Sequence, residues 1–168
     1  MDLSVEIEVQ WDIPEGYSAS EFDPYLISQA EWEAWFVQWL QRLDPQLSPI
    51  NTYGVGLCLT LDPQMQQFNA QFRHRDQPTD VLAFASLERE ALPPQIWQSQ
   101  PLELGDIIIS LETAYRQSAE HQHSFKQEVA WLASHGLLHL LGWDHPTPTR
   151  LEEMLAQQDQ LLQQVGLH

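Results

Sequence analysis

Three histidines near the C-terminal end of the chain have the spacing of a metal site. His135 and His139 are four residues apart, so on a helix their imidazoles stack on one face, one turn above the other. Gly142 follows, and glycine allows a helix to end in a left-handed turn. The chain can then double back and bring His145 to the same point. Three imidazoles with an open fourth position are typical of catalytic zinc, so we predict one zinc per chain, bound by His135, His139 and His145.

The spacing resembles that of the metzincin metalloproteases, which share the three histidines and the glycine. The proteases have a glutamate directly after the first histidine as general base, and this chain has Gly136 there. The metal ligands are retained and the peptidase base is missing, which favours a metal hydrolase of another kind. A core role for the histidines is the alternative, but three of them with glycine at the hinge favour the metal.

Composition limits the class of protein. The chain has 168 residues, 43% of them hydrophobic, which suits one domain over residues 1–168. The formal net charge is −17, and an acidic chain is repelled by nucleic acid and anionic lipid at long range. The single cysteine, Cys58, excludes an intrachain disulfide and favours a reducing compartment. There is no signal peptide pattern and no run of about 18 apolar residues, so we predict a cytoplasmic protein without a membrane span.

The hydrophobic patterns predict alternating strands and helices, hence a mixed α+β or α/β layered fold. Strands are expected at 3–10, 54–61, 81–84 and 104–110, with loops at 12–30 and 88–103. Helices are expected at 31–43, from Asp62 as N-cap to 72, through 114 to about 120, from Ser124 as N-cap to 141, and from 147 to Gly166. His121 and His123 are expected in a loose polar turn, without a metal role at that spacing.

Two arginines stand close together in a chain with seven basic residues, Arg73 and Arg75. Guanidinium groups pair bidentately with phosphate, so these residues form either an anion clamp or part of a solvated loop, and their types alone favour neither. Asp144, next to His145, either orients a ligand imidazole or caps the turn.

Three separated blocks resemble the YbeY family of bacterial metal-dependent endoribonucleases. Residues 135–145 (HGLLHLLGWDH) resemble its signature, 73–84 (RHRDQPTDVLAF) its Arg-x-x-Asp-x-Pro-Thr-Asp-Val-Leu-Ser-Phe segment, and 104–109 (LGDIII) its Leu-Gly-Asp-Ile strand. Residues 154–162, with Gln158 and Asp159, resemble its C-terminal helix. The chain departs from the family at His74, Ala83 and Ala85, and none of these is a metal ligand.

The resemblance implies a fold, an activity and partners. The fold is a small sheet, mostly parallel with one antiparallel strand, covered by helices. The zinc is held by His135, His139 and His145, and Arg73 and His135 are the catalytic residues. The activity is cleavage of single-stranded RNA, with maturation of the 3′ end of 16S rRNA and ribosome quality control. The partners are this RNA precursor and the ribosome or ribosome-associated proteins.

The chemistry expected is phosphodiester hydrolysis. Zinc can lower the pKa of its water to about 7, and Arg73 would stabilise the transition-state charge. The general base stays open, with Asp144 and His74 as candidates. Because the net charge is −17, the basic footprint must be local, around Arg73 and Arg75 with Lys126 as a further candidate, and binding of free RNA weak and salt-sensitive.

Two other classes of function remain open from the residues. One is a different zinc hydrolase, either peptidase-like, which the missing glutamate opposes, or acting on a small phosphoester. The other is a non-catalytic ribosome-assembly factor stabilised by structural zinc. Structural zinc needs a fourth ligand, and the terminal His168 is a poor candidate.

Overall fold

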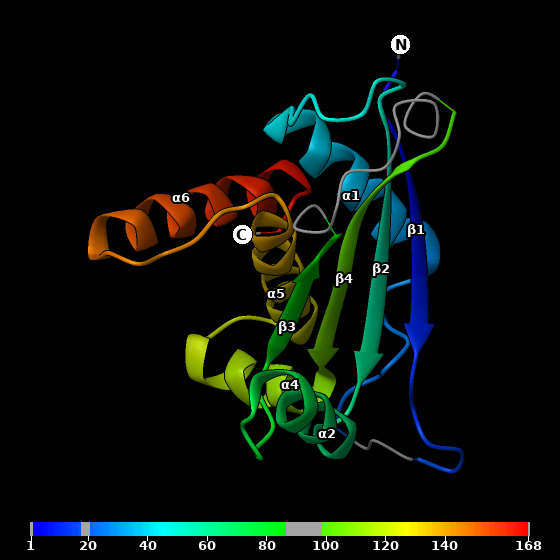
Figure 1. Cartoon of the computed structure of the whole chain (residues 1–168). Coiled ribbons are helices and arrows are strands. Elements are labelled where there is room, and N and C mark those ends of the chain that lie inside the picture. Colours follow the sequence, from blue (N-terminus) through cyan, green and yellow to red (C-terminus); the bar gives the residue numbers. More distant parts are fainter. Residues whose placement is uncertain (1, 18–20, 87–98, 168) are drawn as a thin grey trace.

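The sheet of the protein is small and mixed. The computed structural model describes residues 2–17, 21–86 and 99–167, and these form a four-stranded sheet in the order β1-β2-β4-β3. β1 (Ser4–Trp11), β2 (Thr52–Thr60) and β4 (Leu102–Ser110) are parallel, while β3 (Val81–Ala85) runs antiparallel to β4 (Figure 1). The predicted fold class, a mostly parallel sheet with one antiparallel strand, is confirmed.

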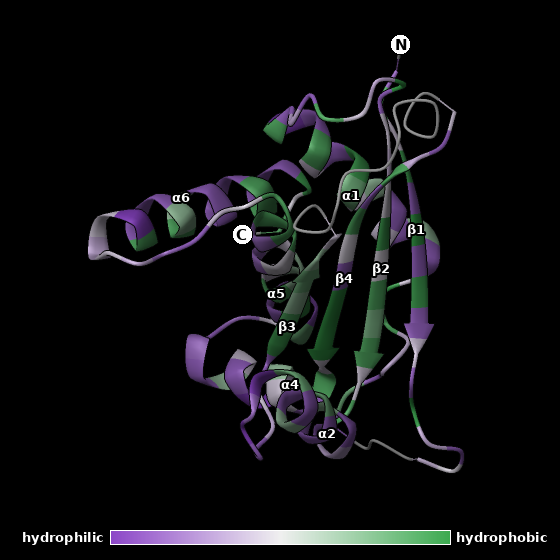
Figure 2. Cartoon of the chain, viewed as in Figure 1, coloured by the Kyte–Doolittle hydropathy of each residue, from purple (hydrophilic) through white to green (hydrophobic). Residues whose placement is uncertain are grey.

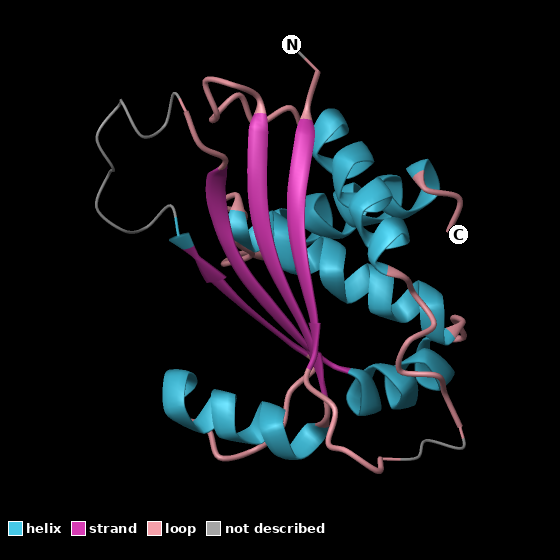
Figure 3. Ribbon diagram, turned by 90° about the vertical axis from the view of Figure 1, so that its right-hand side faces the viewer, coloured by secondary structure: helices cyan, strands magenta, loops and turns pink. Residues whose placement is uncertain are grey.

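Helices cover one face of this sheet. α1 (Gln29–Leu43) and α5 (Phe125–Leu140) pack against the strands, and α6 (Pro148–Gln164) packs against both helices (Figure 3). α4 (Leu111–His121) follows β4 directly and packs against α5. β2, β3 and β4 are largely apolar, whereas β1 alternates between apolar and polar residues, as Figure 2 shows. The buried apolar side chains of β1, β2 and β4 that face the helices form the main core.

The two faces of β4 show how the layers are held. Ile107 and Ile109 are fully buried in the main core below α5. Ile108 points the other way, since successive side chains of a strand alternate, and packs with Met65 of α2 (Asp62–Arg73) and Leu82 of β3. α2 therefore lies on the face opposite α5, beside β3 and β4.

Local capping signals set two of the helix starts. The Ser124 hydroxyl accepts a hydrogen bond from the backbone N–H of Gln127 at 3.1 Å, as predicted, and this begins α5. Thr147 accepts from the backbone N–H of Arg150 at 3.2 Å and begins α6. The helix containing His135 and His139 is therefore fixed at its first turn.

The predicted N-cap role of Asp62 is wrong, because Leu61 holds the N-cap position. The Asp62 carboxylate instead accepts hydrogen bonds from Ser110, Thr113 and Arg116, at 2.6, 2.6 and 2.8 Å. Burial acts to raise the pKa of Asp62, but these three hydrogen bonds outweigh it and lower the pKa. Asp62 thus joins α2 to the start of α4.

Two predicted features fall partly or wholly beyond the described residues. Most of the expected loop at 88–103 does so, but residues 102 and 103 begin β4, two residues before the predicted start. His168 lies outside the described residues as well. In the described ranges, no helix combines the length and the apolar character needed to cross a membrane.

The position of α5 over the sheet depends on the absence of a side chain at Gly136. A Cβ atom at Gly136 would lie 2.7 Å from Cγ2 of Ile107, which is fully buried in β4. We expect Gly136→Ala to lower the free energy of unfolding by about 1–3 kcal/mol through overpacking, measured by denaturant unfolding.

The Ile107→Ala background is the control for this prediction. Ile107→Ala removes the atoms that the new methyl group would strike, so Gly136→Ala should cost much less there. An equal cost in both backgrounds would show that the contact does not position α5.

Candidate metal centre

The three predicted ligands come together at the end of α5. The Nε2 atoms of His135 and His139 are 3.0 Å apart, and the ring centroid of His145 lies 6.0 Å and 5.6 Å from theirs. Ligand nitrogens of all three histidines lie within 4.8 Å of one another. Tetrahedral zinc at about 2.1 Å from each nitrogen separates its ligand atoms by about 3.4 Å, so the three imidazoles fit such an ion with small side-chain movements.

The turn after α5 brings His145 back, as its sequence predicts. The backbone N–H of Gly142 donates to the His139 carbonyl at 3.0 Å, and that of Trp143 donates to the Leu138 carbonyl at 2.9 Å. Gly142 has a φ of 95°, which a residue with a side chain rarely adopts. The Asp144 carboxylate accepts a hydrogen bond from the backbone N–H of His145 at 2.8 Å, so of its two open roles the structure shows the turn cap.

A residue on α6 orients the first histidine. Nδ1 of His135 lies 3.1 Å from Oε1 of Gln158, and Nε2 of Gln158 donates to the Trp131 carbonyl at 3.3 Å. Since the amide nitrogen is occupied, the amide oxygen accepts from Nδ1–H, which leaves the lone pair on Nε2 of His135 for a metal.

Sequence analysis gave Gln158 no role. The available signal was its position between Met154 and Leu161 on the buried face of α6, where a fully buried amide needs polar partners.

The environment of His139 favours its neutral form. Burial lowers the pKa of His139, and the neighbouring imidazoles of His135 and His145 lower it further, against a weaker raising effect of the Trp143 backbone and Asp144. Only a neutral imidazole can bind a metal through its lone pair. At neutral pH His139 is therefore ready to act as a ligand.

His135 and His139 line a cleft that also contains Arg73. The cleft has a volume of about 830 Å³ and is lined from the end of α2, β3, α5 and the following turn: Arg73, Asp80, Val81, Leu82, Ala83, Phe84, Ala85, His135, Gly136, His139, Gly142, Trp143 and Asp144. Arg73 donates from Nη2 to the Ala83 carbonyl at 3.0 Å, and its Cζ lies 4.9 Å from the centre of the Phe84 ring. The guanidinium is therefore held on the wall of the cleft.

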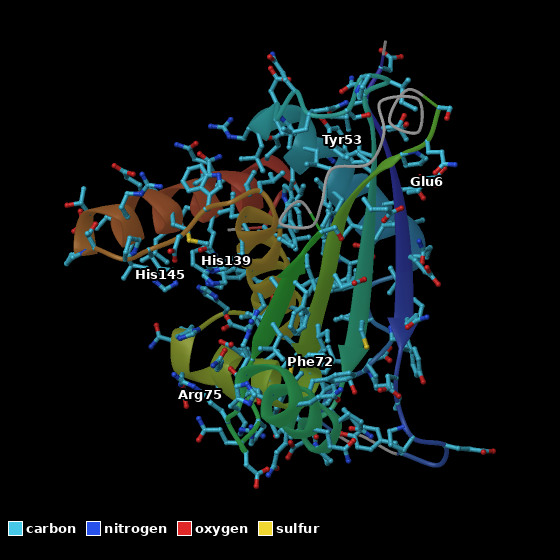
Figure 4. The ribbon with its side chains drawn as sticks, in the orientation of Figure 1. Glu6, Tyr53, Phe72, Arg75, His139 and His145 are labelled. Atoms are coloured by element: carbon cyan, nitrogen blue, oxygen red, sulfur yellow. The ribbon has the colours of Figure 1, made fainter. Side chains whose placement is uncertain are left out.

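The other candidates differ in their positions. Asp144 lines the cleft, whereas His74 caps the end of α2 with a φ of 59° and is not among the described residues that line it. Lys126 does not belong to the site: it forms an ion pair with Glu31 at 2.7 Å, and 13 residues of helix, about 20 Å, separate it from His139. Figure 4 shows His139 and His145 close together beside α5, with Arg75 farther along, near α2 and α4.

The fold and this cleft define a small α/β protein with a three-histidine centre that could hold a metal ion beside an arginine. The family model described as Endoribonuclease YbeY matches residues 19–166, and the chain belongs to this family.

Relatives extend the match over nearly the whole chain. The protein named Endoribonuclease YbeY of Acaryochloris marina is 50% identical, and the alignment covers 95% of this chain and 94% of the relative. The protein of the same name from Trichormus variabilis is 47% identical, over 98% of this chain and 96% of the relative. The solution structure of TM1509 from Thermotoga maritima matches with a TM-score of 0.54 over 94% of this chain and 89% of the other, and at 21% identity it supports the fold alone.

The contact between Gln158 and His135 gives a testable prediction. Gln158→Ala should weaken zinc binding by about 10- to 100-fold, because His135 loses the acceptor that fixes its tautomer and ring orientation. Competition with a chromogenic chelator measures the affinity. The matched control is Gln163→Ala, an exposed glutamine on the same helix, and equal affinities in the two variants would refute the orienting role.

Proposed function

We propose that this protein is a zinc-dependent endoribonuclease that cuts single-stranded RNA. The observation that carries the proposal is the shared cleft: a held guanidinium lines it together with His135 and His139, two of the three converging imidazoles. The name of the relatives, Endoribonuclease YbeY, supports RNA as the substrate class. The two observations are independent, because the cleft is a matter of geometry and the name of the relatives rests on sequence similarity.

The side chains of the cleft divide the work of phosphodiester hydrolysis. His135, His139 and His145 would hold the zinc, which supplies Lewis acidity toward water and a phosphoryl oxygen. Arg73 uses one N–H for the Ala83 carbonyl, and its other donors stay free to pair with phosphate oxygens and to stabilise charge that develops in the transition state. His135 is held for its task by Gln158. Asp144, on the cleft wall, is the candidate general base that the geometry favours over His74.

The electrostatics of the arginines support phosphate binding. In the part of the chain that the structure describes, Arg116, Lys126 and Arg150 each lie within 4.0 Å of a carboxylate, but Arg73 and Arg75 have no such partner. Their charges are therefore not neutralised locally. A phosphate group at the cleft would meet the available guanidinium of Arg73, with Arg75 outside the cleft lining, although the whole chain has a net charge of −17.

An aromatic side chain next to Arg73 favours a single-stranded substrate. The Phe72 side chain is 48% exposed and lies edge-on to Phe84 at 5.3 Å, and Phe84 lines the cleft. Exposed aromatic rings beside basic groups stack unpaired bases, which a duplex does not offer. Phe72 is thus placed to receive a base while Arg73 binds a phosphate.

The biological setting completes the proposal. The 3′ end of 16S rRNA is the proposed target, and maturation of this end and ribosome quality control are the proposed roles in the cytoplasm. Because most of the surface repels RNA, the ribosome or ribosome-associated proteins would supply recruitment, and free RNA would bind weakly and in a salt-sensitive way. A peptidase role has no support, since the position of the protease base is Gly136, packed against Ile107.

Cleavage of a short single-stranded RNA tests the activity. Wild-type protein should cut it, a chelator should stop the cutting, and His139→Ala should abolish it because one metal ligand is lost. Arg73→Ala should lower the rate about 100-fold or more, and Arg73→Lys should lie between, because lysine keeps the charge but not the planar fork. Rates from gel-resolved fragments at fixed salt provide the measurement.

The His139→Ala variant is also the control for contaminating nuclease. If it cuts like wild type, the activity does not belong to this cleft. A zinc-stabilised, non-catalytic assembly factor would then explain the metal site better.

Replacement of Phe72 separates base stacking from charge. Phe72→Ala should weaken binding of single-stranded RNA by at least about fivefold, with an unchanged dependence on salt, because a stacked base is lost and no phosphate contact is. Tyr25→Ala is the matched control, because Tyr25 is an exposed aromatic that contacts Trp11 and not a residue that lines the cleft. Fluorescence anisotropy over a salt series would contradict the stacking role if the two variants bind alike.

A further inference from the structure

A second cluster of metal-ligating side chains lies between α4 and α5. α4 ends at His121, Gln122 follows with a φ of 59°, and His123 lies just before the N-cap of α5. A hydrogen bond from the backbone N–H of His123 to the Ser118 carbonyl, at 2.9 Å, closes the turn around Gln122. This turn brings both imidazoles to one point, so the predicted loose polar turn is wrong.

The point at which they meet is a buried carboxylate. Glu128, in the first turn of α5, has a side chain with no exposed surface. Its Oε1 lies 2.8 Å from Nδ1 of His121, and its Oε2 lies 3.1 Å from Nδ1 of His123. A buried carboxylate is costly without partners, and these two imidazoles together with the N-terminus of α5 compensate it. The three groups are therefore already assembled.

We propose that His121, His123 and Glu128 form a second site for a divalent transition metal such as zinc, separate from the His135, His139 and His145 centre. The ligand atoms of the cluster lie within 4.8 Å of one another. Two imidazoles and one carboxylate are a zinc donor set, and the imidazoles disfavour calcium and magnesium, which prefer oxygen. Seven residues of helix, about 10 Å, separate Glu128 from His135, so one ion cannot serve both sites.

The cluster is able to exchange its hydrogen bonds for a metal. Each neutral imidazole that now donates from Nδ1 can carry its proton on Nε2 instead, which frees the Nδ1 lone pair without a net change in charge. The side chains of His121 and His123 are 48% and 31% exposed, so water can reach this edge of the cluster and fill the remaining coordination positions. The Glu128 carboxylate is the anionic ligand.

Such an ion would connect two helices whose packing supports the first centre. His121 and His123 belong to the end of α4 and the turn after it, and Glu128 belongs to α5, which continues to His135 and His139. A ligand that binds the folded chain better than the unfolded chain stabilises the fold. Zinc should therefore raise the melting temperature through this cluster, independently of RNA cleavage.

Metal titration of the full chain in a background without the first centre tests the proposal. After chelator treatment, wild type should bind two zinc ions per chain and His139→Ala/His145→Ala should bind one, measured by competition with a chromogenic chelator. Adding His121→Ala should lower the zinc affinity of the remaining site by at least about 100-fold, because loss of a direct ligand costs more affinity than loss of a residue that only orients a ligand. It should also abolish the zinc-dependent rise in melting temperature. Adding His74→Ala instead, at an exposed histidine of neither cluster, should change neither.

The outcomes are decisive in both directions. A double variant that binds no zinc, or one whose remaining site is unaffected by His121→Ala, overturns the proposal. Glu128→Gln keeps the shape of the side chain and should also lose the ion, so it replaces His121→Ala if circular dichroism shows that the latter unfolds. Because neither readout involves RNA, failure here leaves the proposed nuclease activity untouched, and failure of the nuclease leaves this site untouched.

Discussion

The close approach of α5 to β4 is the constraint on which the rest of the structure depends. Gly136 lets the helix lie directly on Ile107, and neighbours on both sides of it, Leu137 and Ala133, are fully buried. A helix held this closely cannot rotate without driving backbone or side chains into the sheet. His135 and His139 therefore face the cleft beside β3. The absence of a side chain at Gly136 thus sets the orientation of the two histidines on the same helix.

The cleft combines distant parts of the chain, each positioned by a different interaction. Arg73 comes from the end of α2 and is fixed on β3 by the Ala83 carbonyl and the Phe84 ring. The histidines come from α5 and a glycine turn, and Gln158 comes from α6. α6 is itself anchored to α1, because the indole N–H of Trp39 donates to the Leu161 carbonyl at 2.9 Å. The aromatic face of α1 thus supports the metal centre through α6, although it contributes no residue to it.

Local sequence patterns made part of the metal centre and its helix predictable. The positions of His135, His139 and His145 depend on helical period and one turn, and the N-cap of α5 depends on a hydroxyl three residues from its partner, so a short window of sequence contains all the information. Interactions over long distances in sequence were not visible. Lys126 forms an ion pair with Glu31, Asp62 accepts a hydrogen bond from Ser110, and Gln158 orients His135. The sequence around each of these residues does not indicate which distant residue will be its partner. The His121–Glu128 contact is local, but it depends on the left-handed conformation of Gln122, which propensity does not predict.

The distribution of charge reconciles an acidic chain with an anionic substrate. Glu6, Glu8, Glu103 and Asp106 line a groove on the face of β1, β2 and β4 opposite α5, and Figure 4 shows Glu6 on the side of the molecule away from His139 and His145. Burial and then the nearby negative charges raise the pKa of Glu103, which indicates how closely these carboxylates are gathered. The cleft, in contrast, has Arg73 without a carboxylate partner among the described residues. Asp80 and Asp144 also line the cleft, so Arg73 is a local positive charge and not part of a basic surface. Long-range repulsion disfavours the approach of RNA to the acidic groove, so the negative charge that weakens binding also restricts its orientation.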